Sequence, residues 1–183
     1  MKTSEAVALL EGAVPWSAAG TWADLGCGDG VFTKALVELL AKGGRVYAVD
    51  RDPRAIAALR KRLPNSPNLV PVVADFTRPF ELPGLEQRQL DGILFANSLH
   101  YVRDVEAVLG RLVAMVASGG RVVVIEYDRR AANPWVPYPI GIARWNALAA
   151  SVGLSTPVIT ATRPSRFSGD LYVAAADRAR ISC

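Results

Sequence analysis

A glycine-rich turn is the segment of the sequence most suited to binding a ligand. Glycines alternate with other residues at Gly26, Gly28 and Gly30, directly after a short apolar run. Glycine adopts positive φ at little cost and lets a ligand approach the backbone without a Cβ in the way. The apolar spacing after Gly30 predicts a helix, whose free N–H groups and positive dipole end suit a carboxylate or a phosphate.

Acidic residues end the two apolar runs that follow this turn. Asp50 lies 20 residues after Gly30, where a carboxylate can accept hydrogen bonds from both hydroxyls of a ribose. The next run ends in Ala74-Asp75-Phe76, where a carboxylate can accept from an exocyclic amine while the ring packs against a flat base. Ligands of doubly wound sheets bind beyond the carboxyl ends of the strands, so we expect these residues to share one site.

The spacing of the turn separates two classes of ligand. A dinucleotide-binding turn reads G-x-G-x-x-G, whereas this chain has G-x-G-x-G from Gly26. Asp24 lies two residues before the first glycine, and its carboxylate would repel a pyrophosphate but attract an ammonium or sulfonium group. The turn therefore favours a cationic ligand with an amino-acid part over NAD.

The hydrophobic pattern predicts the elements that position these residues. The predicted strands are 21–25, 45–49, 69–74, 91–96, 121–127, 158–162 and 171–176. The predicted helices are 3–11, 31–41, 53–63 with Asp52 as N-cap, 103–117 and 142–152, with a loop or short irregular helix at 76–89 and a turn at Gly119-Gly120. The early strands are continuous apolar runs, which is typical of a mostly parallel sheet covered by helices on both faces. The last two strands are too close in sequence for a parallel crossover, so we expect them to be antiparallel.

These segments together resemble the motifs of class I S-adenosylmethionine-dependent methyltransferases. The stretch ADLGCGDGVFT resembles motif I, and VYAVDRD, VVADF and LDGILFANSLHYVRD resemble the second to fourth motifs, followed by a strand in GGRVVVIEYD. The match runs from residue 21 to 128. It implies an α/β three-layer sandwich with a doubly wound, mostly parallel seven-stranded sheet of order 3-2-1-4-5-7-6 and one antiparallel strand near the C-terminus. It also implies an enzyme that takes a methyl group from S-adenosylmethionine and releases S-adenosylhomocysteine.

The resemblance implies a role for each matching residue. Gly26, Cys27 and Gly28 would wrap the methionine part of the cofactor, and Asp24 would reach its amino group. Asn97 and Ser98 would face the sulfonium and the transferred methyl. The cofactor-binding residues implied in full are Asp24, Gly26, Cys27, Gly28, Asp50, Arg51, Ala74, Asp75, Phe76, Asn97 and Ser98.

On the nucleoside side, the resemblance divides the roles between two strand ends. Asp50 would bind the ribose hydroxyls, with Arg51 lying along the adenine. Asp75 and Phe76 would bracket the adenine ring. A displacement at a sulfonium methyl needs mainly alignment and desolvation, so no obligatory catalytic motif is expected.

His100 is the single histidine of the chain and the one candidate general base. It could take a proton from the acceptor, or it could pack at the start of a helix. One histidine and two cysteines, Cys27 and Cys183, exclude a multi-histidine metal centre and give no zinc-site pattern, so no metal is expected.

The segment after the fifth strand is a candidate substrate site. Residues 129–145 include several prolines and should face the carboxyl end of the sheet. Arg130, Asn133, Trp135 and Tyr138 would form the substrate wall, the alternative being a stiff surface connection. We expect one domain, 1–183, in which residues 1–20 supply an N-terminal helix that could cover the pocket.

Charge and composition leave three functions open. The formal net charge is +4, and residues 129–183 hold seven arginines against two aspartates. This excess could dock nucleic acid, but no basic run with interleaved aromatics occurs, so a solvated surface is favoured. The favoured function is a cytoplasmic methyltransferase of a small-molecule acceptor, without a membrane segment and with the oligomeric state left open. The alternatives are an RNA or protein methyltransferase and a non-catalytic S-adenosylmethionine-binding protein.

Overall fold

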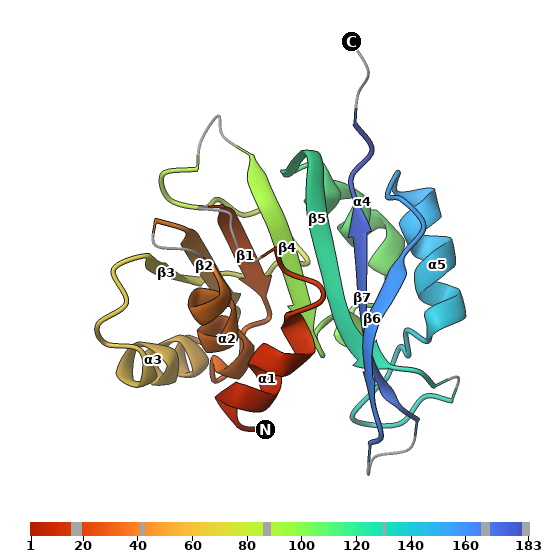
Figure 1. Ribbon diagram of the computed structural model, residues 1–183, viewed down its shortest axis with the longest axis horizontal. Helices are drawn as coiled ribbons and strands as arrows, with labels where there is room; N and C mark the ends of the chain where they lie inside the picture. Colours follow the sequence, from red (N-terminus) through yellow and green to blue (C-terminus); the bar gives the residue numbers. More distant parts are fainter. Residues whose placement is uncertain (16–19, 41–42, 86–88, 130, 166–168, 181–183) are drawn as a thin grey trace.

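A single seven-stranded sheet forms the centre of the molecule (Figure 1). The computed structural model describes residues 1–15, 20–40, 43–85, 89–129, 131–165 and 169–180. The strands are β1 (Thr21–Leu25), β2 (Arg45–Asp50), β3 (Leu69–Val73), β4 (Leu90–Ala96), β5 (Val116–Tyr127), β6 (Val158–Arg163) and β7 (Leu171–Asp177). The helices are α1 (Thr3–Leu10), α2 (Val31–Leu39), α3 (Pro53–Arg62), α4 (Val105–Val113) and α5 (Ile142–Ser151), with a 3-10 turn η1 (Leu99–Tyr101).

The strand order confirms the predicted topology. The sheet reads β3-β2-β1-β4-β5-β7-β6. The first five strands in this order pair in parallel, and β7 runs antiparallel to both β5 and β6. The crossover direction reverses between β1 and β4, so the carboxyl ends of these two strands border the crevice where such sheets bind ligands.

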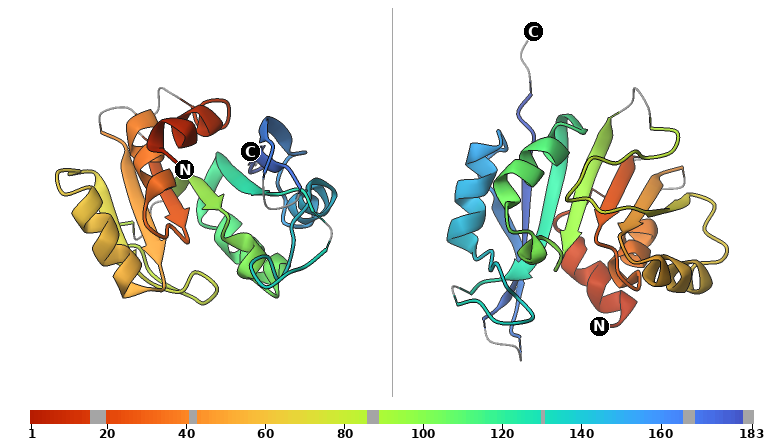
Figure 2. Two further views of the ribbon diagram at one scale, coloured as in Figure 1. Left: turned by 90° about the horizontal axis from the view of Figure 1, so that it is seen from below. Right: turned by 180° about the vertical axis from the view of Figure 1, so that it is seen from behind.

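Helices cover both faces of the sheet, because strand side chains alternate between two apolar clusters. Val46 packs in a cluster with α1 and α2, whereas Tyr47 and Val49 pack in the cluster that contains α4 and α5. Helix α3 covers Ala48 on the same face as α2. Helix α4 lies behind the strands in Figure 1 and in front of them in the right panel of Figure 2. The result is the three-layer sandwich expected from the continuous apolar strands.

Local chemistry explains why α3 begins where it does. Asp52 is its N-cap, and the Asp52 side chain accepts a hydrogen bond from the backbone N–H of Arg54 at 2.8 Å. Pro53 occupies the first turn, where its missing N–H costs nothing. The predicted cap and start are therefore confirmed, and β2 is followed at once by a rigid helix.

The prediction was wrong around the start of β5. Helix α4 ends at Val113 rather than at residue 117, and β5 already begins at Val116. Leu90 of β4 pairs with Val116, and the register then shifts so that Gly92 pairs with Arg121. Gly119-Gly120 therefore lies within an irregular part of the strand instead of forming the turn before it.

Within the described residues, no helix combines the length and the apolar character needed to cross a membrane. Trp16 and Cys183 lie outside the described residues.

Candidate active site

A cavity of about 620 Å³ opens at the carboxyl ends of β1, β2 and β4. Ten of the eleven residues predicted to bind a cofactor line it, Ala74 being the exception. The backbone N–H of Ala74 donates to the carbonyl of Asp50 at 3.0 Å, which extends the β2–β3 pairing. The predicted residues thus gather around one cavity, while Ala74 pairs with the end of β2 through its backbone.

The turn after β1 needs glycine for two different reasons. Gly26 has φ +82°, and a Cβ placed there would lie 2.6 Å from Cβ of Ser98, so the close approach of β1 to β4 requires its absence. Gly28 has φ +52°, and a Cβ there would meet nothing within 4 Å. Gly26 thus permits packing, whereas Gly28 leaves its backbone open to the cavity.

Asp24, near the end of β1, is fully buried, and only one of its two carboxylate oxygens has a hydrogen-bond partner. Its Oδ2 accepts a hydrogen bond from Thr33 Oγ1 at 2.6 Å, while its Oδ1 is buried without a hydrogen-bond partner. Burial is the main cause that raises the pKa of Asp24 to about 7, and the negative charge of Asp50 raises it further. The hydrogen bond from Thr33 acts in the opposite direction and lowers the pKa. A buried carboxylate oxygen without a partner, in the wall of a cavity, suits a cationic ligand group. Thr33, on the buried face of α2, was not predicted.

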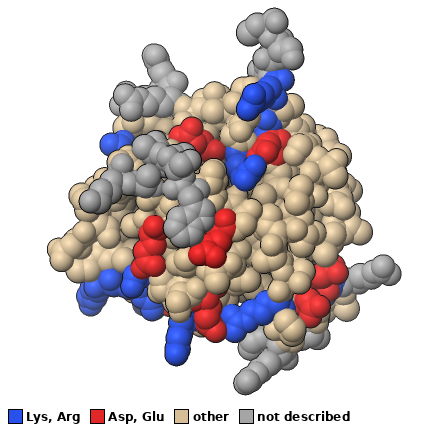
Figure 3. All heavy atoms as spheres, viewed as in Figure 1, with Lys and Arg blue, Asp and Glu red and all other residues tan. Residues whose placement is uncertain are grey.

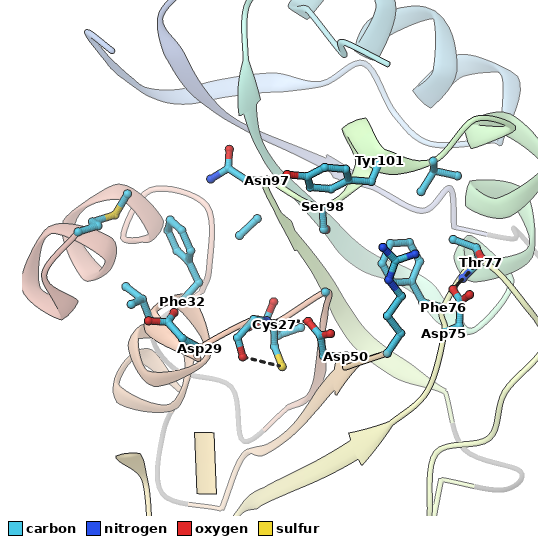
Figure 4. A pocket seen from close by; sticks show the side chains of 18 of the residues that line it. Cys27, Asp29, Phe32, Asp50, Asp75, Phe76, Thr77, Asn97, Ser98 and Tyr101 are labelled. Atoms are coloured by element: carbon cyan, nitrogen blue, oxygen red, sulfur yellow. Dashed lines mark hydrogen bonds between the residues drawn. The ribbon is translucent and has the colours of Figure 1, made fainter. Parts of the chain in front are cut away.

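Asp50 at the end of β2 ties the glycine turn to the neighbouring strand. Its Oδ2 accepts from the backbone N–H of Gly28 at 2.9 Å, and its Oδ1 accepts from the N–H of Asp52 at 2.9 Å. Each oxygen keeps further acceptor capacity, which a pair of hydroxyl groups can use. Figure 4 shows Asp50 between Cys27 and Asp75 within the cavity.

The loop after β3 supplies a carboxylate next to an aromatic wall. Asp75 Oδ1 accepts from the backbone N–H of Thr77 at 2.9 Å and from its hydroxyl at 2.6 Å, and these bonds lower the pKa of Asp75. The ring of Phe76 is buried and meets Phe95 edge to face, with the ring centroids 5.9 Å apart. Arg51 is exposed and also lines the cavity. An ionised carboxylate beside a flat apolar wall suits an amino-substituted ring.

Asn97 and Ser98, directly after β4, serve different purposes. The Ser98 hydroxyl is buried and donates to the carbonyl of Leu25 at 2.6 Å, which joins β4 to β1. Asn97 has φ +55°, and its Oδ1 is buried without a hydrogen-bond partner. Both line the cavity, and Asn97 keeps an acceptor available to a ligand.

A second cavity of about 440 Å³ adjoins the first. Asn97 and Tyr101 line both cavities. Tyr101 is 56% exposed, so it is a wall residue and not part of the core. Of the predicted substrate residues, Asn133 and Trp135 line the second cavity.

The other two predicted substrate residues lie elsewhere. Tyr138 does not line the second cavity, and its backbone N–H donates to the carbonyl of His100 at 3.0 Å, which holds the loop against η1. Arg130 lies outside the described residues.

His100 lines the second cavity and is held by a glutamate that was not predicted. Its Nδ1 lies 2.6 Å from Oε2 of Glu126, and its backbone N–H donates to Oε1 at 3.2 Å. Glu126 has no exposed surface, and His100 is 2% exposed. The sequence signal was a single acid within the apolar run of β5.

The first cavity fits S-adenosylmethionine by its donors and acceptors. The unpartnered oxygen of Asp24 suits an ammonium group, Asp50 suits vicinal hydroxyls, and Asp75 with Phe76 suits an adenine. The open backbone at Gly28 leaves room for the ligand between them. Met1, directly before α1, also lines this cavity.

Comparison with known proteins identifies relatives of this chain. A family described as "Methyltransferase domain" matches residues 23–122. Trans-aconitate 2-methyltransferase of Paracidovorax citrulli is 34% identical over 119 residues, which are 64% of this chain and 42% of that protein. Nodulation protein S of Sinorhizobium fredii is 35% identical over 103 residues, 55% of this chain and 44% of that protein. The chain thus spans less than half the length of these curated relatives.

Solved structures share the fold at low sequence identity. The CurJ carbon methyltransferase superposes with a TM-score of 0.73 at 19% identity, covering 93% of this chain and 51% of that one. Magnesium protoporphyrin IX methyltransferase from Synechocystis PCC 6803, with bound S-adenosylmethionine, gives a TM-score of 0.67 at 18% identity, covering 97% and 78%.

Proposed function

The chain belongs to the class I S-adenosylmethionine-dependent methyltransferases, and on this premise we propose that it methylates a small organic acceptor bound in the second cavity. The observation that carries the proposal is the sharing of Asn97 and Tyr101 by the two cavities. A donor in the first cavity and an acceptor in the second would meet at these two residues. Within a single domain, Asn133 and Trp135 would contact the acceptor, and Met1 would border the cofactor.

The residues of the first cavity bind and orient the cofactor. Asp24 holds its ammonium group, Asp50 its ribose hydroxyls, and Asp75 with Phe76 its adenine. S-adenosylmethionine supplies a methyl group on a sulfonium, which a nucleophile takes by in-line displacement to leave S-adenosylhomocysteine. The protein contributes alignment and exclusion of water, because the sulfonium already activates the methyl.

His100 takes the proton of the acceptor where the nucleophile starts protonated. Nδ1 lies 2.6 Å from Oε2 of Glu126, and in this proposal Nδ1–H donates to that oxygen, which leaves the lone pair of Nε2 for the acceptor's proton. The nucleophile's O–H or C–H bond breaks, its proton passes to Nε2, and its electron pair becomes available for the methyl. Glu126 acts as a positioning residue that fixes the tautomer and the ring orientation.

The names of relatives support a small acceptor. One is a trans-aconitate methyltransferase, and one structural neighbour is a mitomycin 7-O-methyltransferase. One relative speaks for the alternative that the acceptor is a macromolecule. A ribosomal protein L11 methyltransferase is 52% identical over 44 residues, but these residues are only 24% of this chain.

The arginine-rich C-terminal part gives little support to docking of RNA or protein. Arg163 pairs with Glu5 at 2.9 Å, Arg144 donates to the carbonyl of Pro139, and Arg178 donates to backbone carbonyls. On the face seen in Figure 3, acids and bases are interspersed without a continuous basic band. Binding of RNA that weakens steeply with salt would favour the alternative.

Calorimetry and a turnover assay test the proposal together. We expect the folded protein to bind S-adenosylhomocysteine, and to convert S-adenosylmethionine to it only when a suitable small hydroxylated or carbon-acid acceptor is added. Absence of binding by folded protein would contradict the cofactor site. Tight binding without turnover over a broad acceptor panel would instead indicate a non-catalytic cofactor-binding protein.

A further inference from the structure

Arg129 lies directly beyond the end of β5 and lines the second cavity. Its backbone N–H donates to the carbonyl of Tyr127 at 2.9 Å, which fixes the start of the loop. Its side-chain Nε is buried without a hydrogen-bond partner, although the side chain as a whole is partly exposed. A guanidinium remains charged at all ordinary pH values, and a buried donor without an acceptor is costly. None of the described residues supplies this acceptor, and an anionic group bound in the second cavity can supply it.

The acids nearest in sequence to Arg129 are engaged elsewhere. Asp128 Oδ1 accepts from the backbone N–H of Ile142 at 3.0 Å and so caps the start of α5. Glu126 is fully buried and is paired with His100. Among the described residues that line the second cavity, Arg129 is the only Lys, Arg, Asp or Glu. The described lining of the cavity thus presents one positive charge and no carboxylate.

The walls of the same cavity present flat aromatic surfaces. Trp135 is 74% exposed and Tyr101 is 56% exposed, which is unusual for side chains of this size. The Tyr101 ring lies with its centroid 4.3 Å from that of His100. Asn133 Oδ1 accepts from the backbone N–H groups of Trp135 and Val136 at 3.0 and 2.7 Å, which holds the turn that carries the tryptophan. The remaining amide N–H groups of Asn133 are donors, as an anion requires.

From this arrangement we infer that the second cavity binds a planar organic acid, whose anionic group pairs with Arg129 while its flat body packs between Trp135 and Tyr101. The inference rests on the proposed function and specifies its acceptor class. A volume of about 440 Å³ suits a molecule with one or two rings. Carboxylates and phosphates both match the guanidinium fork, whereas the positive charge of Arg129 makes the binding of cations less favourable.

Binding of matched acids and amides tests this inference. The protein is saturated with S-adenosylhomocysteine and titrated by calorimetry with cinnamate, 4-hydroxybenzoate and phenyl phosphate, and with cinnamamide and 4-hydroxybenzamide. We expect at least one acid to bind, and its neutral amide to bind about ten- to hundred-fold more weakly, as the loss of one charge-assisted hydrogen bond implies. The phosphate and carboxylate probes show which anion the cavity prefers.

Two variants assign the effect to the residue. Arg129→Gln should remove the preference for acid over amide, and Arg129→Lys should retain part of it because the charge remains. Arg103→Gln is the matched control, since Arg103 is exposed and lines neither cavity. Thermal unfolding of each variant verifies that it is folded.

Three results would overturn the inference: equal binding of acids and amides by the unaltered protein, no binding of any acid, or an undiminished preference in Arg129→Gln. Titration with S-adenosylhomocysteine alone keeps this test separate from the proposed function. Arg129→Gln should bind that product normally, because Arg129 does not line the first cavity. A failure there in the unaltered protein would concern the cofactor site and not the acceptor class.

Discussion

The backbone N–H of Gly28 donates to Oδ2 of Asp50 at 2.9 Å, so the turn after β1 is fastened to the end of β2. One carboxylate thereby shapes the glycine turn and borders the cavity at the same time. Substitution of Asp50 should affect both properties, and two variants separate them.

Replacement of Asp50 should weaken cofactor binding. Asp50→Ala removes the acceptor of two backbone N–H groups and the proposed acceptor of the ribose hydroxyls, and we expect a loss of about 1.5–3 kcal/mol in S-adenosylhomocysteine affinity. Asp50→Asn keeps one acceptor oxygen and should lose less. Calorimetric titration measures both, with the exposed Asp104→Asn as control. An Asp50→Ala variant of undiminished affinity would remove Asp50 from the site.

The buried carboxyl of Asp24 predicts a pH dependence of stability. Its pKa is raised by burial from 3.8 to about 7, so between these values the folded protein holds a proton that the unfolded chain releases. The free energy of unfolding should therefore fall as pH rises through this window. Asp24→Asn lacks this titration, and its stability relative to the unaltered protein should increase by about 2–3 kcal/mol from pH 5 to pH 8.

Urea unfolding at the two pH values measures this difference. The groups facing Asp24 are Thr33, which does not titrate, Asp50, and Cys27, whose thiol pKa is raised by burial so that it stays protonated over this range. A stability difference between Asp24→Asn and the unaltered protein that is independent of pH would contradict the assignment. At pH 6, uptake of S-adenosylhomocysteine should also release protons, because its ammonium group favours the ionised carboxylate; calorimetry in buffers of different ionisation enthalpy detects this.

Gly26→Ala should destabilise the protein more than Gly153→Ala, because at Gly153 the only cost is the unfavourable backbone conformation. Both Gly26 and Gly153 have positive φ, at +82° and +77°, but only at Gly26 would the new Cβ collide with Ser98. We expect a loss of about 1 kcal/mol in the free energy of unfolding for Gly153→Ala and about 2–4 kcal/mol for Gly26→Ala. Equal losses in urea unfolding would show that β1 and β4 can separate without cost.

The pairing of His100 with Glu126 predicts a spectroscopic signature that requires no acceptor. An untagged protein has one histidine, so a nitrogen-15 spectrum contains a single imidazole. We expect the neutral ring to carry its proton on Nδ1, and Glu126→Gln to shift the population toward the other tautomer. A neutral ring protonated mainly at Nε2 in the unaltered protein would contradict this arrangement.

Kinetics test whether His100 removes a proton. With a hydroxyl or carbon-acid acceptor, His100→Gln should lower kcat about 10²- to 10⁴-fold while S-adenosylhomocysteine affinity is unchanged. Glu126→Gln should lower kcat less and alter its pH profile, as befits a positioning residue. Turnover of His100→Gln that equals the unaltered protein at saturating acceptor would exclude the base role.

Features that depend on interactions between residues close in sequence were predictable from the sequence. Asp52 and Pro53 define the start of α3 by local chemistry, and the apolar runs determined the parallel sheet. The start of β5 was mistaken because the pairing of Leu90 with Val116 outweighs the local preference of Gly119-Gly120 for a turn. Long-range pairing of this kind leaves no signal within one segment.

The candidate site likewise contains residues that were predictable from local sequence and residues whose contacts depend on distant parts of the chain. Asp24, Asp50 and Asp75 were predicted to lie together because each is at or just beyond the end of an apolar run, and the carboxyl ends of parallel strands lie at one edge of the sheet. Glu126 was not singled out, and Arg129 was included only as part of the segment 129–145, because the contacts of these two residues depend on His100 and on a cavity wall contributed by residues distant in sequence. A single polar residue in or after an apolar strand does not reveal which partner the fold will give it.

The two cavities are contributed by almost separate stretches of chain, with Asn97 and Tyr101 as their common border. We therefore expect substitutions of Asn133 and Trp135 to change acceptor preference and to leave the affinity for S-adenosylhomocysteine unaltered, because neither residue lines the first cavity. On the proposed function, preference for the acceptor and affinity for the methyl donor can thus change independently of each other.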